Sequence, residues 1–167
     1  MQNSKDSAAV HPENQRYLAF SLGAEHFAVP LLSVKEVVAL PEMTRVPNTA
    51  AYFCGIMNLR GQIISVYDLR TRFGIKSEPS SENAVIIHNF PNLCFGVVVS
   101  SVDHVLSLAA GDIHEKPDFH DSQASAYITG VSHQGEKLVL LLDVVRALKL
   151  EELAASKERD VKSRNVA

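Results

Sequence analysis

The feature that most constrains the fold of this chain is an internal repeat. Residues 27–37 follow the pattern F-x-V-x-L-x-S-V-x-x-V, which returns at residues 95–105 as F-x-V-x-V-x-S-V-x-x-V. A second segment, 55–69, holds two glycines and an apolar stretch ending in Asp-Leu, and 130–144 resembles it with the same spacing from first glycine to aspartate. Such self-similarity indicates two tandem copies of one structural unit. A unit of about 60 residues buries little surface alone, so we expect the two to share a core.

Short β-branched and aromatic segments, separated by turn signals, fill the middle of the chain. The expected strands are 17–22, 25–29, 34–40, 62–69, 84–88, 94–99, 102–108 and 138–144. Turn signals recur about every 8–12 residues, which is typical of a barrel or a sandwich. Helical signals are few: one turn at 68–73 closed by Gly74, and a longer segment after Asp143. The sequence therefore predicts an all-β fold.

Composition divides the chain into three zones. Residues 1–16 are polar and read as a flexible tail, whereas 151–167 are rich in charge and read as a helix that then frays. Residues 17–150 form the folded domain, with two intertwined units at roughly 17–74 and 84–150. We expect residues 1–14 and roughly 158–167 to be dispensable, because neither stretch offers apolar residues at core spacing.

Charge and hydropathy exclude several classes of protein. The net charge of −3 offers no basic excess for binding nucleic acid. The longest aliphatic run, Leu138–Leu142, is far shorter than the roughly 20 residues of a membrane span, and the N-terminus lacks the apolar stretch of a signal peptide. Two cysteines are too few for a disulfide framework and are expected to be buried free thiols. The predicted location is the cytoplasm, with no insertion into a membrane.

No catalytic, cofactor or metal motif stands out in the sequence. The glycines form neither a dinucleotide fingerprint nor a phosphate-binding loop. The acidic, histidine-containing stretch 112–121 has no standard zinc spacing and reads as a solvated loop. A second stretch, 100–104, contains Ser, Asp and His, but neighbours on one strand point to opposite faces and cannot converge on a substrate. We therefore expect no enzymatic activity, no cofactor and no metal.

The most distinctive motif is Asn58-Leu59-Arg60-Gly61, followed by an apolar strand that ends at Asp68. Gly61 permits a backbone turn that a Cβ atom would strain, and the Asn58 side chain can hold that turn by a local hydrogen bond. Arg60 is either a surface donor or the partner of a carboxylate, and Glu36 and Asp68 are the two candidates. A solvated ion pair of this kind would contribute under ~1 kcal/mol to stability.

Residues 55–74 (GIMNLRGQIISVYDLRTRFG) closely resemble the signature of the CheW family of coupling proteins in bacterial chemosensory arrays. Further matches are 20–30 (FSLGAEHFAVP), 34–37 (VKEV), 44–48 (TRVPN), 96–99 (GVVV) and Val102, so the resemblance covers about residues 17–150. Two positions depart from the family pattern. Ser65 replaces a common strand proline, and Ser100 replaces a common Asp near the expected partner contacts.

The resemblance implies a fold of two packed SH3-like five-stranded barrels with a short C-terminal helix. It also implies a non-enzymatic adaptor in chemotaxis signal transduction, which binds the regulatory domain of a CheA-type histidine kinase and the cytoplasmic tip of chemoreceptors. The kinase domain resembles the same double barrel, and the receptor tip is a helical hairpin. The adaptor would be recruited from the cytoplasm to membrane-associated receptor arrays.

Several residues are candidates for partner contact. A groove between the barrels suits an amphipathic helix, and its candidate lining is Val34, Val38 and Val99, although each of these valines could equally be core. Strand alternation would place Glu36 on the same face as Val34 and Val38. The resemblance implies a contact or signalling role for Glu36 and Arg60.

Two other functions remain open at this point. One is a small-molecule sensor module with a ligand cavity between the barrels. The other is a coupling protein of a different chemosensory system, such as one that drives pilus-based motility.

Overall fold

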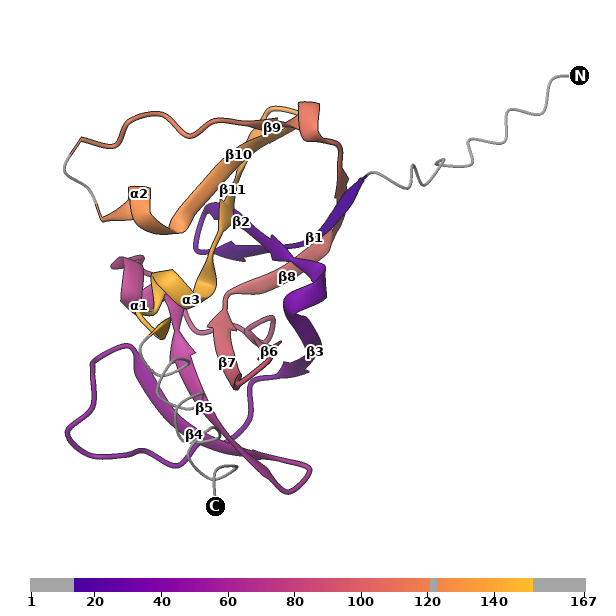
Figure 1. Cartoon of the computed structure of the whole chain (residues 1–167). Coiled ribbons are helices and arrows are strands. Elements are labelled where there is room, and N and C mark those ends of the chain that lie inside the picture. Colours follow the sequence, from indigo (N-terminus) through magenta and orange to yellow (C-terminus); the bar gives the residue numbers. More distant parts are fainter. Residues whose placement is uncertain (1–13, 121–122, 152–167) are drawn as a thin grey trace, which may run out of the picture.

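The computed structural model describes residues 14–120 and 123–151 (Figure 1). Its elements in chain order are β1 (Gln15–Leu22), β2 (Glu25–Pro30), the 3-10 turn η1 (Leu31–Ser33), β3 (Val34–Ala39), β4 (Phe53–Leu59), β5 (Gln62–Asp68), α1 (Leu69–Phe73), β6 (Ala84–Phe90), β7 (Leu93–Val99), β8 (Ser101–Leu108), the 3-10 turn η2 (Ala110–Asp112), β9 (Ile113–His114), α2 (Ala124–Tyr127), β10 (Ile128–Gln134), β11 (Lys137–Leu142) and α3 (Val144–Ala147). The expectation of an all-β double barrel is confirmed.

The strands form two sheets that repeat one topology. The six-stranded sheet has the order β8-β1-β2-β11-β10-β9, and the five-stranded sheet has the order β3-β6-β7-β5-β4. If each strand is replaced by its counterpart in the other repeat, the order of the first five strands of the six-stranded sheet becomes the order of the five-stranded sheet. Each sheet also takes strands from both halves of the chain, because β2 pairs in parallel with β11 and β5 pairs in parallel with β7.

Local sequence explains the hairpin and the short helices. Gly23, with φ of +59°, makes the β1–β2 turn. The Asp68 carboxylate caps α1 by accepting hydrogen bonds from the amides of Arg70 and Thr71, and Gly74 ends this turn in the left-handed conformation. In the second unit Asp143 caps α3 in the same way. In Figure 1, α1 and α3 lie together on one side of the molecule, between the two sheets.

The segment after Asp143 is less helical than expected within the described residues. α3 spans only Val144–Ala147, and Glu151 is helical again at the end of the described chain. At the other end β1 begins at Gln15, so two residues of the expected N-terminal tail belong to the sheet. Residues 1–13 and 152–167, which hold the rest of both expected tails, lie outside the described residues.

Three apolar clusters fill the fold. The largest, the inter-sheet core, takes side chains from both sheets and from α1 and α3. The two smaller clusters lie within one sheet each: one uses β1, β2, β8 and β11, and the other uses β4, β5, β6 and β7. The sharing of one large core follows from the exchange of strands between the sheets.

Three strands of the structure were not among the predicted ones: β4, the two-residue β9, and β10. Of these, β4 and β10 each contain the first glycine of the second repeat, Gly55 or Gly130. Both glycines sit at register shifts, where the strand carries an irregularity opposite its partner. A Cβ atom on Gly55 would lie 2.3 Å from the carbonyl oxygen of Thr44, and one on Gly130 would lie 2.8 Å from Cγ2 of Ile113. These glycines therefore permit close strand packing rather than chain reversal.

Candidate functional site

The Asn58-Leu59-Arg60-Gly61 motif forms the tip of the β4–β5 hairpin. Leu59 and Gln62 are paired across the strands, so Arg60 and Gly61 alone make the turn. Their φ angles are +50° and +87°, which is the pattern of a tight hairpin turn with both central residues left-handed. The Gly61 amide donates a 2.8 Å hydrogen bond to Oδ1 of Asn58. In Figure 1 this hairpin tip extends beyond the body of the molecule.

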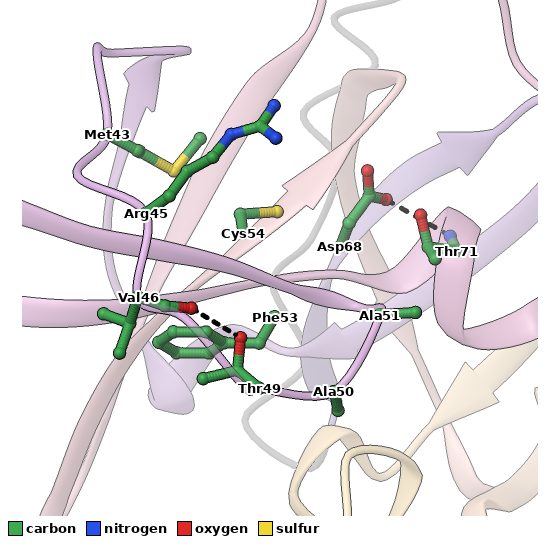
Figure 2. Close-up of a pocket in the computed structure, with 10 residues that line it drawn as sticks. All are labelled: Met43, Arg45, Val46, Thr49, Ala50, Ala51, Phe53, Cys54, Asp68 and Thr71. Carbon is green, nitrogen blue, oxygen red and sulfur yellow. Dashed lines mark hydrogen bonds between the residues drawn. The ribbon is translucent and has the colours of Figure 1, made fainter.

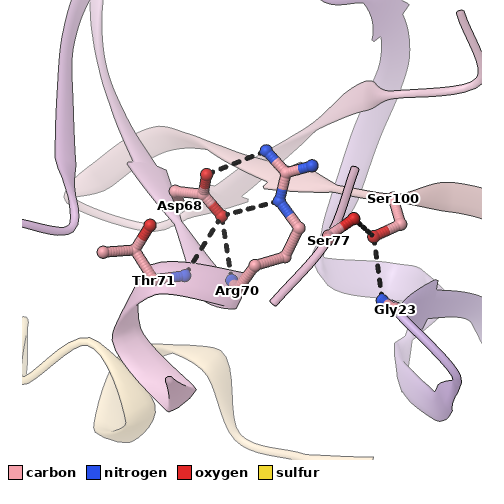
Figure 3. A network of polar contacts seen from close by, with 6 residues as sticks. All are labelled: Gly23, Asp68, Arg70, Thr71, Ser77 and Ser100. Atoms are coloured by element: carbon pink, nitrogen blue, oxygen red, sulfur yellow. Dashed lines mark hydrogen bonds and ion pairs between the residues drawn. The ribbon is translucent and has the colours of Figure 1, made fainter. Parts of the chain in front are cut away.

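Arg60 forms an ion pair with Glu36, the first of its two candidate partners. The Arg60 side chain is 69% exposed and the Glu36 side chain is 25% exposed. The other candidate, Asp68, is already occupied, since it caps α1 and receives two side-chain hydrogen bonds from Arg70 at 2.9 and 3.0 Å (Figure 3). The hydrogen bonds to Asp68 raise the pKa of the Arg70 guanidinium. The Arg60–Glu36 pair therefore links the hairpin tip to β3.

A β-bulge in β3 corrects the expected arrangement of its side chains. The register with β6 shifts between Val34 and Glu36, so one extra residue lies on β3. As a result Val34 packs against the inter-sheet core, whereas Val38 packs against the smaller cluster of the five-stranded sheet. Val34, Glu36 and Val38 therefore do not share one face, because the bulge reverses the alternation after Val34.

Val99 was a candidate for the groove lining, and the structure places it elsewhere. Its exposed fraction is 0% and it belongs to the inter-sheet core. A side chain with no exposed surface cannot contact a partner while the core stays packed. Val99 is therefore a core residue.

Four exposed apolar residues that the sequence reasoning missed occupy equivalent positions of the repeat. Val37 on β3 and Val105 on β8 are 42% and 47% exposed, and Ile63 on β5 and Leu138 on β11 are 72% and 52% exposed. The repeat contained the signal, because its last valine recurs at 37 and 105 where an ordinary surface strand would tolerate a polar residue. Apolar side chains exposed at matched positions point to interaction surfaces.

The bulge in β3 recurs in β8, which explains the three-residue spacing of the paired valines. The register between β1 and β8 shifts so that Leu18 faces Val105 and Phe20 faces Val102. Leu18 and Phe20 both belong to the inter-sheet core. Val102 and Val105 therefore lie on the core-facing side of β8, as Val34 and Val37 do on β3.

Ser100 and Ser65, the two departures from the family pattern, have different surroundings. The Ser100 hydroxyl accepts a 2.9 Å hydrogen bond from the Gly23 amide and lies 3.1 Å from the hydroxyl of Ser77 (Figure 3). Ser100 thus ties the β1–β2 turn to the end of β7. Ser65 lies within β5, between β4 and β7, where a proline would lack the amide of the sheet ladder.

A cavity of about 570 Å³ lies beside the five-stranded sheet (Figure 2). Its lining includes Arg45, which has no ion-pair partner among the described residues, and the thiol of Cys54. Burial, reinforced by the charge of Asp68, raises the pKa of the Cys54 thiol to about 11, so this thiol stays protonated at neutral pH. Both Cys54 and Cys94 are free and half-buried.

The structure also gathers a Ser, a His and an Asp that the sequence reasoning did not bring together. Ser21 Oγ donates to Oδ2 of Asp103 at 2.9 Å, so the nearby Nδ1 of His26, 3.3 Å from Oγ and 3.7 Å from Oδ2, does not receive the hydroxyl hydrogen. A nucleophilic serine must instead give its proton to the imidazole. The cluster therefore lacks the geometry of a catalytic triad.

The described part of the chain holds no group of three metal-ligating side chains and no buried side-chain polar atom without a hydrogen-bond partner. None of its helices is long and apolar enough to cross a bilayer.

Comparison with known proteins gives consistent matches. A family model described as a CheW-like domain matches residues 16–152. The chain is 38% identical over 141 residues to the chemotaxis protein CheW of Klebsiella aerogenes, covering 84% of this chain and 85% of that protein. It is 28% identical over 150 residues to the chemotaxis protein CheW of Treponema pallidum, covering 87% and 88%. The crystal structure of the scaffolding protein TtCheW from Thermoanaerobacter tengcongensis matches with a TM-score of 0.71 and 29% identity, over 78% of this chain and 89% of that one.

Proposed function

The chain belongs to the CheW family, and from this membership we propose that it links chemoreceptors to a CheA-type histidine kinase through two different surfaces of the double barrel. The protein is a non-enzymatic coupling adaptor of chemotaxis. The proposal concerns its partners and the residues that contact them. The observation that carries it is the presence of exposed apolar side chains at two sets of repeat-equivalent positions.

The receptor surface is the pair of bulged strands, β3 and β8. Val37 and Val105 are exposed, while Val34 and Val102 beside them are half-buried against the inter-sheet core. Apolar side chains at the surface suit contact with the apolar face of an amphipathic helix, and the tip of a chemoreceptor is a helical hairpin. We assign the receptor contact to these four valines, which replaces the expected lining of Val34, Val38 and Val99.

The kinase surface is the tip of the β4–β5 hairpin. Ile63 is 72% exposed two residues after Gly61, and the Arg60 side chain beside it is 69% exposed. An exposed apolar residue with an adjacent guanidinium is typical of an interface that combines burial with charge pairing. The kinase regulatory domain has a related double barrel, so a barrel end of the kinase fits this hairpin tip.

The two surfaces meet at the Glu36–Arg60 ion pair. Glu36 lies on β3 between Val34 and Val37, and Arg60 belongs to the hairpin tip. Apolar contact supplies affinity at each surface, while a charge beside it selects the register of the partner. Glu36 and Arg60 therefore serve partner orientation rather than folding. The hairpin turn is shaped by Asn58, Leu59 and Gly61. Asp68 lies at the end of β5, where it caps α1.

Separate binding titrations test the assignment. We would measure the affinity for a receptor signalling hairpin and for the kinase regulatory domain in Val37→Asp, Ile63→Asp and Val46→Asp variants. Val46 is 39% exposed and lies on neither surface, so it is the matched control. Val37→Asp is expected to weaken receptor binding only, Ile63→Asp to weaken kinase binding only, and the control to weaken neither. If Val37→Asp and Ile63→Asp weaken both partners equally, the two-surface assignment is wrong.

The site of action follows from the partners. We propose that the protein is recruited from the cytoplasm to membrane-associated receptor arrays by these contacts, without inserting into the membrane. Fluorescent fusions would show clusters in cells that contain the receptors, and a diffuse distribution in cells without them.

A further inference from the structure

We propose that His88 is a positioning residue, which fixes the crossover between the two sheets through a hydrogen bond to Ser33 and thereby sets the geometry of the Val34–Val37 segment. The inference about partner geometry rests on the proposed receptor surface. The inference about the crossover itself rests only on the fold.

His88 is a polar residue in an aromatic part of the core. Its exposed fraction is 1%, and its place on β6 pairs it with Val34 of β3 on one side and Phe95 of β7 on the other. The imidazole stacks on Phe95 and Phe90, with ring centroids 5.4 and 6.1 Å away. An apolar ring would make the same stacks without the cost of burying a polar group, so packing alone does not explain a histidine here.

The hydrogen-bond geometry assigns a role to the imidazole nitrogen. The Ser33 hydroxyl donates its only hydrogen to the carbonyl oxygen of Pro30, at 2.8 Å. Nδ1 of His88 lies 3.3 Å from the same hydroxyl oxygen. Because the hydroxyl hydrogen is already used, the network assigns the hydrogen to His88 Nδ1, which donates to Ser33.

The imidazole acts as a neutral donor rather than as a charge. Burial lowers the pKa of His88 to about 4, and a hydrogen bond with the backbone of Ser33 opposes this effect only in part. A neutral imidazole has one donor and one acceptor nitrogen, which suits a fixed link to a hydroxyl group.

Besides this link, the crossover packs the partly buried Leu31 against the inter-sheet core. η1 joins β2 of one sheet to β3 of the other, and none of its three residues is buried. Leu32 in its middle is 96% exposed. The bulge of β3 follows at once, so the direction in which Val34 leaves the turn is set by the residue before it. Ser33 is that residue, and its side chain bonds to Pro30 behind it and to His88 beneath it.

The test compares His88→Phe, Ser33→Ala and Ser33→Thr in the full chain. His88→Phe keeps the aromatic ring but removes the donor, and the Ser33 hydroxyl retains its bond to Pro30. Ser33→Ala removes the acceptor, whereas Ser33→Thr keeps a hydroxyl and is the rescue variant. Hydrogen exchange of the Val34 amide, which closes η1 by donating to Leu31, reports on the crossover without any partner. Affinity for the receptor hairpin measures the effect of the crossover on the Val34–Val37 segment.

We expect exchange of the Val34 amide to accelerate, and receptor affinity to fall, by about fivefold in His88→Phe, the usual effect of one hydrogen bond, and by more in Ser33→Ala, which also loses the bond to Pro30. The double variant should lose no more than Ser33→Ala alone, Ser33→Thr should stay close to the wild type, and kinase affinity should not change in any of them. Unchanged Val34 exchange in His88→Phe would overturn the proposal. If Val34 exchange accelerates in His88→Phe but even the wild type does not bind the receptor hairpin, the positioning role of His88 stands and the proposed receptor surface is wrong.

Discussion

Acid should destabilise this protein through His88. The folded-state pKa of His88 is about 4, whereas its ordinary value is 6.5. Between these values the unfolded chain binds a proton that the folded chain does not, so stability falls as the pH falls. The loss begins near the unfolded pKa and is complete below the folded one.

The size of the effect follows from the difference between the two pKa values. A shift of this size corresponds to about 3 kcal/mol in full, at roughly 1.36 kcal/mol per unit. Between pH 7 and pH 5 about 2 kcal/mol of this is lost, because the unfolded histidine is then almost fully protonated while the buried one is still neutral.

Urea unfolding at pH 7 and pH 5 measures the loss, with His88→Phe as the control. The variant has no titrating ring at this position but keeps every other acid and base. The wild type should lose about 2 kcal/mol more than the variant over this range. Equal losses in the two proteins would refute the reasoning, since they would show that His88 is not buried in a neutral form.

Three further predictions follow from the fold. Gly61→Val should lower the free energy of unfolding by about 1–2 kcal/mol, the cost of a left-handed conformation for a residue with a Cβ atom, and so lower the melting temperature. Gly61→Asn should lower both by less, because the φ of +87° and not a steric clash is the cause. Equal melting temperatures for both variants and the wild type would contradict this turn. Fragments 14–76 and 77–151, expressed separately, should show no cooperative thermal transition, because both sheets need strands from both halves; a cooperative transition in either fragment would contradict the shared core. The Cys54 thiol should react slowly with a disulfide reagent at pH 8 in the folded protein and rapidly in urea, because its pKa is about 11; equally fast reaction in both states would count against its burial.

The repeat was the part of the fold that could be predicted most fully from the sequence. It indicated two related units, and the two sheets do share one strand order. The turn of helix between Asp68 and Gly74 was equally predictable, since its cap, its length and its terminating glycine are all local signals. These features depend on residues close together in the chain.

Features that depend on a partner strand were not predictable from local patterns. The bulge after Val34 becomes visible only when β3 is paired with β6, and it moves Val34 to the opposite side from Val38. The need for a glycine at position 55 was not predictable, because its close approach to Thr44 involves a segment outside its own strand. In the sequence, Val99 could not be distinguished from the other candidate valines, Val34 and Val38. Its full burial depends on the packing of both sheets.

The sequence predicted some contacts around the candidate site and missed others. Glu36 was one of two carboxylates considered as a partner of Arg60, and these two residues form an ion pair. Val37 was missed, because strict alternation along β3 would place its side chain on the exposed face, opposite the face of the candidate residues. The bulge places it instead opposite Ile86, a residue of the inter-sheet core, on the same side of β3 as Val34.

The most direct test is whether this protein brings together the two partners proposed for it. Energy transfer between a labelled receptor signalling hairpin and a labelled kinase regulatory domain would be measured with and without this protein. We expect transfer only when it is present, reduced by Glu36→Ala and Arg60→Ala and abolished by Val37→Asp or Ile63→Asp, all in folded proteins. If all four variants, folded, restore the full wild-type signal, these residues are ordinary surface positions and the coupling surfaces lie elsewhere.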